Sequence, residues 1–303
     1  VTPSRDTRVS QGGSDPSARR WARPRPGVLR TPAMELVYPA ATLGALGLFR
    51  ALGLRLCVEG DAHVPATGPV VLAGTHVSFL DFALLGLAAR RNRRRLRFLA
   101  RDDLWQAPWV GPVLAGALDR MGHVPVDRAA PAAAYLRARS LLRGGEALGI
   151  FPEAGISTSY TVRSLMPGAV ALARETGAPI LPVAIWGPQR LLTAHRQADL
   201  TRGRPVGLLV GTPLLVPPGQ DVTAGTVLLG ERLQELLEEL QRRPEHRPAP
   251  GERAPWHPAH LGGQATHPRV ALAGADLPGS AVPSAGQRWG YPGGRDDEPA
   301  EVA

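Results

Sequence analysis

The sequence predicts an α/β fold in which helices flank a mostly parallel central sheet. Short runs of branched and apolar residues, such as Val70–Gly74 and Ile180–Trp186, are typical of buried parallel strands. Segments with helical periodicity, such as Gly168–Thr176, lie between such runs, and this repeated alternation favours α/β layering. The chain has 303 residues, of which 44% are hydrophobic, so it is long enough to bury a sizeable core.

The remaining elements follow from the same patterns in chain order. Strands are expected over residues 54–58, 96–100, 123–126, 147–151 and 206–210. Helices are expected over residues 82–89, 110–119, 129–142 and 226–243. The last helix is amphipathic, because five leucines recur at helical spacing on one face: Leu229, Leu233, Leu236, Leu237 and Leu240.

Cysteine usage excludes two classes of protein. The single cysteine, Cys57, rules out an intramolecular disulfide framework and a cysteine-based zinc cluster. Because Cys57 lies in the first of the predicted strands, we expect it to be buried and structural. No spacing of metal ligands and no glycine-rich nucleotide loop occurs along the chain, so no metal site is expected.

Composition divides the chain into four parts. Residues 1–33 are rich in Ser, Arg, Pro and Gly and are expected to be a disordered leader. Residues 34–55 form an apolar helix that is too short and too glycine-rich to span a bilayer, so we expect it to face the membrane interface; packing on the domain is the alternative. Residues 56–243 form the folded domain. Residues 244–303 contain 10 Pro and 9 Gly and are expected to be a disordered tail.

The charge of the chain favours an anionic partner. The formal net charge is +9, no lysine is present, and residues 34–243 alone carry a net +6. Phosphate, an anionic membrane surface and an acidic carrier protein all fit this balance. The densest basic run covers residues 90–97, which either contact anionic lipid, CoA phosphates or an acidic carrier, or form a solvated connection. Nucleic acid is not expected, because stacking aromatics are sparse near the run.

His76 and Asp81 form the candidate catalytic pair. A histidine takes up a proton near neutral pH, and a carboxylate can orient its ring and stabilise the charged form. Five residues within one helix turn about 500°, which would leave the two side chains about 140° apart. The pair therefore works only if His76 precedes a helix that Asp81 begins, with Ser78 as the predicted N-cap. The alternative is a capping box with no catalytic role.

Four ordered blocks connect this pair to a known family. They read THVSFLD at residues 75–81, GHVPVDR at residues 122–128, FPEAGIS at residues 151–157 and APILPVA at residues 178–184. In these blocks the chain resembles the glycerolipid acyltransferase family, the 1-acyl-sn-glycerol-3-phosphate or lysophosphatidic acid acyltransferases. Order and spacing agree from about Leu56 to Leu215. The resemblance implies that residues 56–243 are the acyltransferase domain.

The resemblance implies a reaction and a set of site residues. His76 would act as the general base on the hydroxyl of a lysophospholipid, such as 1-acyl-glycerol-3-phosphate, with Asp81 orienting its ring. That hydroxyl would attack the thioester of acyl-CoA or acyl carrier protein directly, and no cofactor beyond this co-substrate is implied. Backbone N–H groups near the helix start or near Gly155 would hold the oxyanion. The expected substrate-binding residues are Arg128, Glu153, Gly155, Ser157, Arg101 and Arg163.

The third block departs from the family pattern. The family's arginine is replaced by Ile156, so a cation that would help to hold phosphate is missing there. Arg163 and Arg101 are candidates to replace it, and Glu153 either holds an acceptor hydroxyl or orients the loop. The departure leaves a different lyso-lipid or a glycolipid hydroxyl open as the acceptor. A lipid-binding protein without turnover and a thioesterase are the rival functions. The expected location is the cytoplasmic face of the membrane, as a peripheral or monotopic protein.

Overall fold

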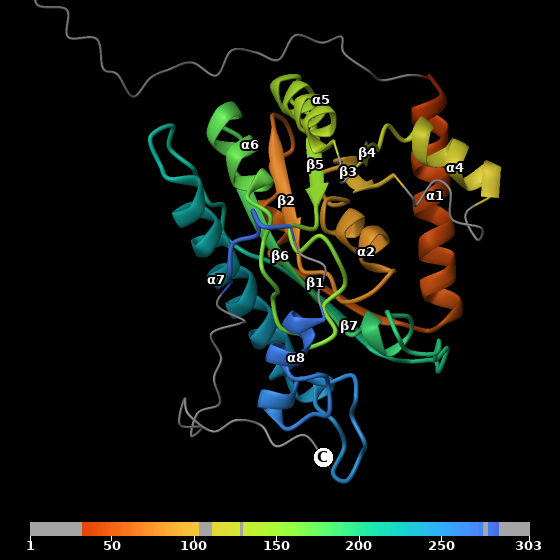
Figure 1. The fold of residues 1–303 in the computed structure, drawn as a ribbon. Helices are drawn as coiled ribbons and strands as arrows, with labels where there is room; N and C mark the ends of the chain where they lie inside the picture. Colours follow the sequence, from red (N-terminus) through yellow and green to blue (C-terminus); the bar gives the residue numbers. More distant parts are fainter. Residues whose placement is uncertain (1–31, 103–110, 128–129, 275–277, 285–303) are drawn as a thin grey trace, which may run out of the picture.

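The computed structural model describes residues 32–102, 111–127, 130–274 and 278–284 (Figure 1). The strands are β1 (Arg55–Glu59), β2 (Val70–Gly74), β3 (Leu96–Arg101), β4 (Val124–Val126), β5 (Ala147–Ile150), β6 (Ile180–Trp186) and β7 (Pro205–Val210). The α-helices are α1 (Pro32–Ala51), α2 (Asp81–Ala88), α4 (Gly111–Arg120), α5 (Pro131–Arg143), α6 (Gly168–Thr176), α7 (Val222–Gln241) and α8 (Pro268–Ala273). Short 3₁₀ turns are η1 (Asp61–His63), η2 (Pro188–Arg190), η3 (Pro244–His246) and η4 (Ala259–Leu261).

The described strands form one sheet in the order β1-β7-β6-β2-β5-β3-β4. Neighbouring strands pair in parallel throughout, except that β7 runs antiparallel to β6. The prediction of a mostly parallel sheet flanked by helices is therefore confirmed. The reversed direction of β7 has a consequence for function, because it brings the start of β7 to the sheet edge at which β6 and β2 end.

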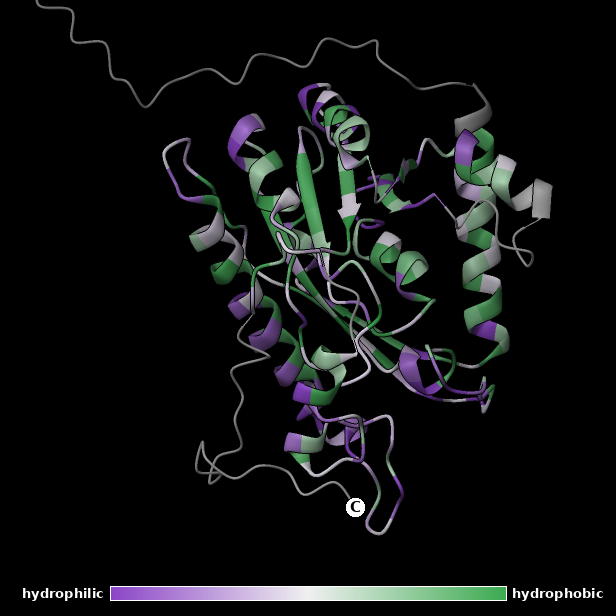
Figure 2. Ribbon diagram, viewed as in Figure 1, coloured by the Kyte–Doolittle hydropathy of each residue, from purple (hydrophilic) through white to green (hydrophobic). Residues whose placement is uncertain are grey.

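Each face of the sheet packs against its own layer of helices (Figure 1). Alternate residues of β2 serve the two layers: Val71 and Ala73 join the cluster with α5, α6 and α7, whereas Val70 and Leu72 join the cluster with α1 and α2. Figure 2 shows the strands between the layers as largely hydrophobic. Burial on both faces explains why the central strands read as continuous apolar runs in the sequence.

Helix α1 packs on the domain along one side only. Phe49 is buried in the cluster with α2, and the backbone N–H of Leu96 donates to the Tyr38 hydroxyl over 2.9 Å. Leu36 and Leu43, seven residues apart, are 76% and 67% exposed. They lie on one outward face, because seven residues complete about two helical turns. Among the helices that the structure describes, none is both long and apolar enough to cross a membrane.

The expectation of a disordered tail from Pro244 is wrong for the described part of that segment. Trp256 is buried in the core cluster with α7, and its ring centroid lies 3.4 Å from the Arg190 guanidinium carbon. Further along, Leu165 and Val282 pair through an antiparallel bridge. Proline and glycine lower helix and strand propensity, but apolar anchors such as Trp256 offset the entropy of ordering the chain. Residues 285–303 and the predicted leader, up to residue 31, lie outside the described residues.

The expectation that Cys57 is buried is wrong. Cys57 is exposed, because β1 is an edge strand and this residue faces outward, where its thiol donates to Glu59 Oε1 over 3.3 Å.

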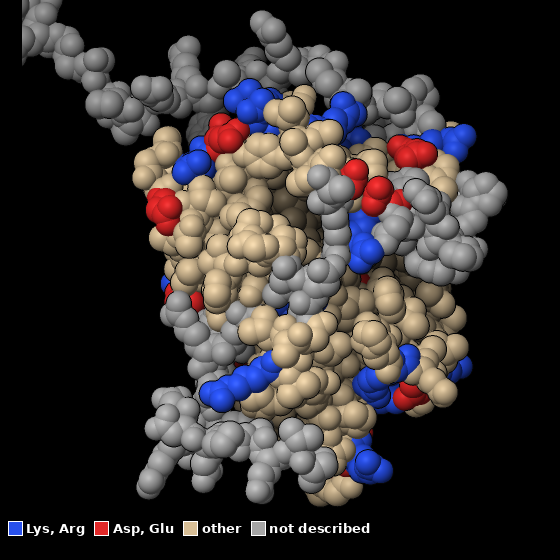
Figure 3. Space-filling model, viewed as in Figure 1, with Lys and Arg blue, Asp and Glu red and all other residues tan. Residues whose placement is uncertain are grey.

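The basic run at residues 90–97 lies between the end of α2 and the start of β3, at the opposite sheet edge from His76. Figure 3 shows arginines along this upper edge. Part of the run makes contacts within the protein: Arg91 pairs with Asp61, and Arg94 donates to Gly68 O. The run therefore lies away from His76, and its contact with anionic lipid, CoA phosphates or an acidic carrier stays a prediction.

Candidate active site

Parallel strand ends bring the candidate residues to one edge of the sheet. His76 follows the end of β2, Glu153 follows the end of the adjacent parallel strand β5, and Arg101 ends β3. Ligands of open α/β sheets bind at this carboxyl edge. The backbone N–H of His76 donates to Glu153 Oε1 over 2.8 Å, so the first and third sequence blocks meet directly.

The His76–Asp81 pair has the geometry of an oriented general base. Helix α2 begins at Asp81 and His76 lies in the loop before it, as the spacing argument predicted. Oδ2 of Asp81 lies 2.9 Å from His76 Nδ1 and also accepts the backbone N–H groups of Val77 and Ser78, each at 2.7 Å. A hydrogen on Nδ1 leaves the lone pair of Nε2 for proton abstraction.

An aromatic wall holds the histidine ring. The ring stacks on Phe151 with centroids 4.4 Å apart, and Phe82 meets it edge-on at 5.8 Å. The His76 side chain is 11% exposed, whereas Asp81 is fully buried. Burial raises the pKa of the Asp81 carboxyl, and its hydrogen bonds to His76 and to two backbone N–H groups oppose that rise. The ring therefore reaches the surface while its partner is shielded from water.

Ser78 is not the N-cap that the sequence predicted. The helix begins three residues later, at Asp81, and the Ser78 hydroxyl donates to Leu192 O over 2.6 Å and accepts from Leu80 N–H at 3.1 Å. The Asp81 carboxylate binds the Ser78 N–H instead. Ser78 thus ties the histidine loop to the segment after η2, and its hydroxyl is committed to that contact. Thr193 braces the same loop by donating to Val77 O over 2.7 Å, a contact that the sequence did not indicate.

Glu153 is fully buried and binds two backbone N–H groups. Its Oε1 accepts from His76 N, and its Oε2 accepts from Arg163 N at 3.0 Å. Burial raises the pKa of this carboxyl to about 7. Both oxygens face the protein backbone, which favours loop orientation over contact with an acceptor hydroxyl. Glu153 therefore fixes the loop of the third block against His76.

The guanidinium of Arg163 lies where the third block lacks its arginine. Its Nη1 donates to Ile156 O over 3.4 Å, and a Cβ on Gly155 would lie only 2.6 Å from the same nitrogen. Glycine at this position thus leaves the space that the guanidinium occupies. Arg163, the candidate to replace the arginine missing at position 156, therefore contacts Ile156 itself.

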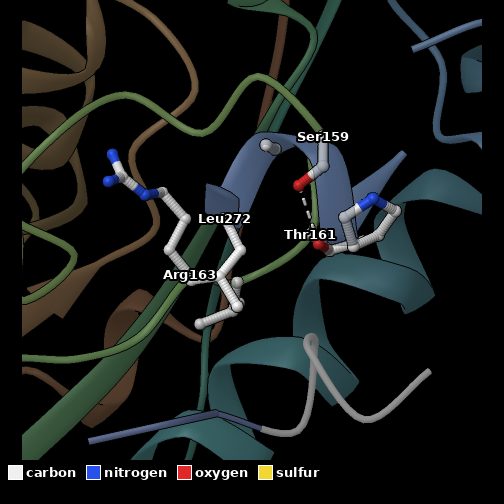
Figure 4. Close-up of a pocket in the computed structure, with 7 residues that line it drawn as sticks. Ser159, Thr161, Arg163 and Leu272 are labelled. Atoms are coloured by element: carbon white, nitrogen blue, oxygen red, sulfur yellow. Dashed lines mark hydrogen bonds between the residues drawn. The ribbon is translucent and has the colours of Figure 1, made fainter. Parts of the chain in front are cut away.

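The loop of the third block is closed on itself by hydroxyl groups. Ser157 is buried; its hydroxyl donates to Thr161 O over 2.7 Å, and its N–H donates to His76 O over 2.8 Å. Ser159 and Thr161 share a hydrogen bond of 2.9 Å. Figure 4 shows Leu272 of α8 beside this loop, with the Arg163 side chain extending away from Ser159 and Thr161. Ser157 thus holds the loop rather than presenting its hydroxyl to a ligand.

Two other arginines, Arg101 and Arg128, are predicted to bind substrate. Arg101 is exposed at the end of β3, opposite Val126 in the register of β3 and β4. Arg128 lies outside the described residues.

His123 is structural, because its Nδ1 accepts the Phe98 N–H over 3.1 Å and burial lowers its pKa to about 4.

Backbone N–H groups near the site differ in their availability. Those of Val77 and Ser78, at the helix start, are already bound by Asp81. In the described part of the chain, the N–H groups of Gly155 and Ile156 make no hydrogen bond. The N–H groups of Phe79 and Phe82, at the helix start, also make no hydrogen bond with the described residues, so both predicted oxyanion sites keep donors. No group of three His, Cys, Asp or Glu residues within the described ranges is arranged to hold a metal ion.

Comparisons with known proteins identify the family of the chain. The acyltransferase family model matches residues 55–186. The chain is 30% identical over 192 residues to 1-acyl-sn-glycerol-3-phosphate acyltransferase of Bacillus subtilis, covering 61% of this chain and 89% of that protein. The chain belongs to the acyltransferase family. This acyltransferase is also 26% identical over 165 residues to the chloroplastic 1-acyl-sn-glycerol-3-phosphate acyltransferase LPAT1 of Arabidopsis thaliana, covering 53% of this chain and 44% of that protein.

A solved structure supports the same assignment. The acyltransferase superposes on the 1-acyl-sn-glycerophosphate acyltransferase PlsC of Thermotoga maritima with a TM-score of 0.58 and 25% sequence identity. The match covers 71% of this chain and 85% of the Thermotoga chain. The family match runs from β1 to the end of β6, and therefore contains His76, Asp81, Glu153 and Arg163.

Proposed function

We propose that this acyltransferase moves a fatty acyl group from acyl-CoA or acyl carrier protein to the free hydroxyl of 1-acyl-glycerol-3-phosphate, giving phosphatidic acid. The single observation that carries the proposal is the His76–Asp81 hydrogen bond of 2.9 Å, with the imidazole at the carboxyl edge of the sheet. The names of the relatives from Bacillus, Arabidopsis and Thermotoga support this acceptor and product.

The proposed chemistry is direct transfer without an acyl-enzyme. Nε2 of His76 accepts the proton of the acceptor hydroxyl while its oxygen forms a bond to the thioester carbonyl carbon. The carbonyl becomes a tetrahedral oxyanion, and Asp81 stabilises the imidazolium that forms. When the oxyanion collapses, the carbon–sulfur bond breaks and the thiolate takes the proton from His76. The products are an ester and a free thiol, and the histidine is neutral again.

The oxyanion is assigned to the loop after Glu153. The N–H groups of Gly155 and Ile156 make no hydrogen bond with the described residues, and Glu153 fixes their loop against His76. Removing one preorganised donor of this kind typically costs about 10²–10³-fold in rate. Positioning by the loop therefore adds to the effect of the general base.

Arg163 is the proposed ligand of the acceptor phosphate. Its guanidinium lies against Gly155 and Ile156, beside the loop that Glu153 ties to His76. A guanidinium can bind phosphate through two parallel N–H bonds. Arg101, which ends β3 at the same edge, and Arg128, which lies outside the described residues, are the other proposed phosphate ligands.

We further propose that the protein works at the cytoplasmic face of a membrane, held by the outward side of α1. The exposed Leu36 and Leu43 on that side, and Phe79 beside the catalytic loop at 49% exposure, support an apolar contact with lipid. Figure 2 shows α1 as mainly hydrophobic along its length.

A panel of acceptors with one labelled acyl-CoA, read by lipid mass spectrometry, tests the function. Labelled phosphatidic acid formed from 1-acyl-glycerol-3-phosphate, in preference to products of lysophosphatidylcholine or monoacylglycerol, is the expected result. Release of CoA without any acceptor would identify a thioesterase instead. No CoA release with any acceptor or donor, acyl carrier protein included, would identify a lipid-binding protein without turnover.

A further inference from the structure

An open groove lies between the carboxyl end of α1, the start of β1 and the loop before β7. Its volume is about 640 Å³, and its walls include Leu46, Phe49, Leu54 and Leu56. Phe49 is buried and the three leucines are half-buried, so they form an apolar floor. This volume falls in the range of ordinary ligand pockets, roughly 300–1,000 Å³.

Two arginines stand over this apolar floor, Arg50 from α1 and Arg202 from the loop before β7. Both are exposed, and neither makes an ion pair or hydrogen bond with the part of the chain that the structure describes. A Cβ on Gly53 would lie 3.8 Å from Arg202 Nε, which places that side chain directly over the turn after α1. The groove lining that the structure describes contains no acidic residue.

Other arginines at this corner of the molecule are already engaged. Arg55 Nε donates to Gly203 O over 3.1 Å, Arg204 pairs with Asp199, and Arg190 stacks on Trp256. Figure 3 shows arginines gathered at the lower right, over the loop before β7. Arg50 and Arg202, by contrast, can still donate hydrogen bonds to an external anion.

The groove opens at the same sheet edge as the active site. Because β7 is antiparallel to β6, the start of β7 lies beside the end of β6, which neighbours β2 and His76. The start of β1 lies beside the start of β7, since these two strands are parallel. In the sheet order β1 and β2 are three strand spacings apart, which is roughly 14 Å. No lining residue of the groove belongs to the catalytic loops. A ligand here is close to the reacting centre but separate from it.

We propose that this groove binds an anionic phospholipid of the bilayer, with its phosphate between Arg50 and Arg202 and an acyl chain on the apolar floor. Only an amphipathic anion matches both parts of the lining, two unpaired cations above four hydrophobic side chains. The exposed Leu48 of α1, next to Phe49, continues the apolar surface toward solvent. Such a lipid would fix the catalytic edge against the membrane, whichever acceptor the enzyme uses.

Calorimetric titration of the full chain with short-chain lipids below their micelle concentration tests the proposal. The probes are dihexanoyl phosphatidylglycerol, dihexanoyl phosphatidylcholine and inorganic phosphate. The test variant is R50Q/R202Q, and the matched control is R90Q/R137Q, which removes the same charge from exposed arginines at other places. A third variant, R163Q, reports on binding at the proposed acceptor site. Since all four arginines of the two double variants are exposed, both variants should fold normally.

The expected result is saturable binding of one phosphatidylglycerol, weakened at least about tenfold in R50Q/R202Q and unchanged in R90Q/R137Q and R163Q. Phosphatidylcholine and inorganic phosphate should each bind at least about tenfold more weakly, because one lacks net charge and the other lacks a chain. If both double variants lost phosphatidylglycerol affinity equally, the binding would reflect general electrostatic attraction, and the proposed site would be wrong. Loss in R163Q alone would assign the lipid to the acceptor site, and phosphate binding as tight as lipid would overturn the lipid assignment. These readouts require no turnover, so failure here is distinct from failure of the proposed acyl transfer.

Discussion

Glu153 Oε1 accepts the backbone N–H of His76 over 2.8 Å, which joins two residues that lie 77 positions apart in the chain. Its other oxygen accepts the N–H of Arg163 over 3.0 Å. One buried carboxylate therefore sets the position of the proposed base relative to the loop proposed to hold the oxyanion and the phosphate. Changes at Glu153 should consequently act on both, although its two carboxylate oxygens bind only backbone N–H groups among the described residues.

Stability should depend on pH through Glu153. Burial raises its pKa from 4.5 to about 7 in the folded state, so the folded protein binds the proton more tightly than the unfolded chain. The resulting stabilisation, on the order of 3–4 kcal/mol at most, is fully present below pH 4.5 and is lost as pH rises through 7. Urea unfolding of wild type and Glu153→Gln between pH 4.5 and 8 measures this dependence.

The glutamine variant separates titration from hydrogen bonding. It offers one acceptor oxygen for two N–H donors, which should lower the free energy of unfolding by about 1–3 kcal/mol. Because glutamine does not titrate, the wild type should lose stability relative to the variant as pH rises. If the two curves stay parallel over this range, Glu153 does not have a raised pKa in the folded protein.

Asp81→Asn should leave the fold intact and lower the rate. An amide oxygen can still accept the N–H groups of Val77 and Ser78, but a neutral amide neither stabilises the imidazolium nor enforces the hydrogen on Nδ1. We expect kcat for acyl transfer to fall by about 10²–10⁴-fold with little change in KM. Asp61→Asn, at a surface pair with Arg91, is the control and should keep its rate. A variant as active as wild type would remove Asp81 from the mechanism.

Arg163→Gln should affect binding of the phosphate more than the chemistry. Its backbone N–H, which Glu153 binds, is unchanged, whereas the guanidinium beside Gly155 is lost. We expect KM for 1-acyl-glycerol-3-phosphate to rise by about 10–100-fold, with a smaller effect on kcat. Arg137→Gln on α5 is the matched control and should have wild-type kinetics. An equal loss with uncharged monoacylglycerol would argue for a structural role instead.

Trp256→Ala should destabilise the whole domain, because the segment after α7 belongs to its core. Trp256 is buried and lies against the Arg190 guanidinium, so its removal should cost about 3–5 kcal/mol of unfolding free energy. Val270→Ala on α8 is the control; that side chain is 64% exposed and should change stability by less than about 0.5 kcal/mol. Similar stabilities for the two variants would mean that the segment is not part of the folding unit.

Much of the fold and of the proposed site could be predicted because the signals are local. β2, α6 and β6 have the predicted bounds, since apolar runs and helical periodicity depend only on neighbouring residues. The placement of His76 before the helix that Asp81 begins followed from helix geometry alone. Arg163 could be chosen because the third block lacks an arginine and few other cations follow it.

The remaining features depend on contacts between distant segments. The two hydrogen bonds of Glu153, the Leu192 partner of Ser78 and the packing of Trp256 against Arg190 leave no periodic signal in the sequence. The segment after Pro244 has the composition of a disordered tail, yet aromatic anchors order its described part. The exposure of Cys57 depends on β1 being an edge strand, which strand patterns alone do not reveal.

The most direct test is the initial rate of acyl transfer from labelled acyl-CoA to 1-acyl-glycerol-3-phosphate by wild type and His76→Ala. The side chain of His76 reaches the surface, so the variant should fold, which circular dichroism can check. If Nε2 of His76 is the base, labelled phosphatidic acid should form at least about 10²–10⁴-fold more slowly in the folded variant. A folded His76→Ala protein that transfers acyl groups at the wild-type rate would contradict the mechanism.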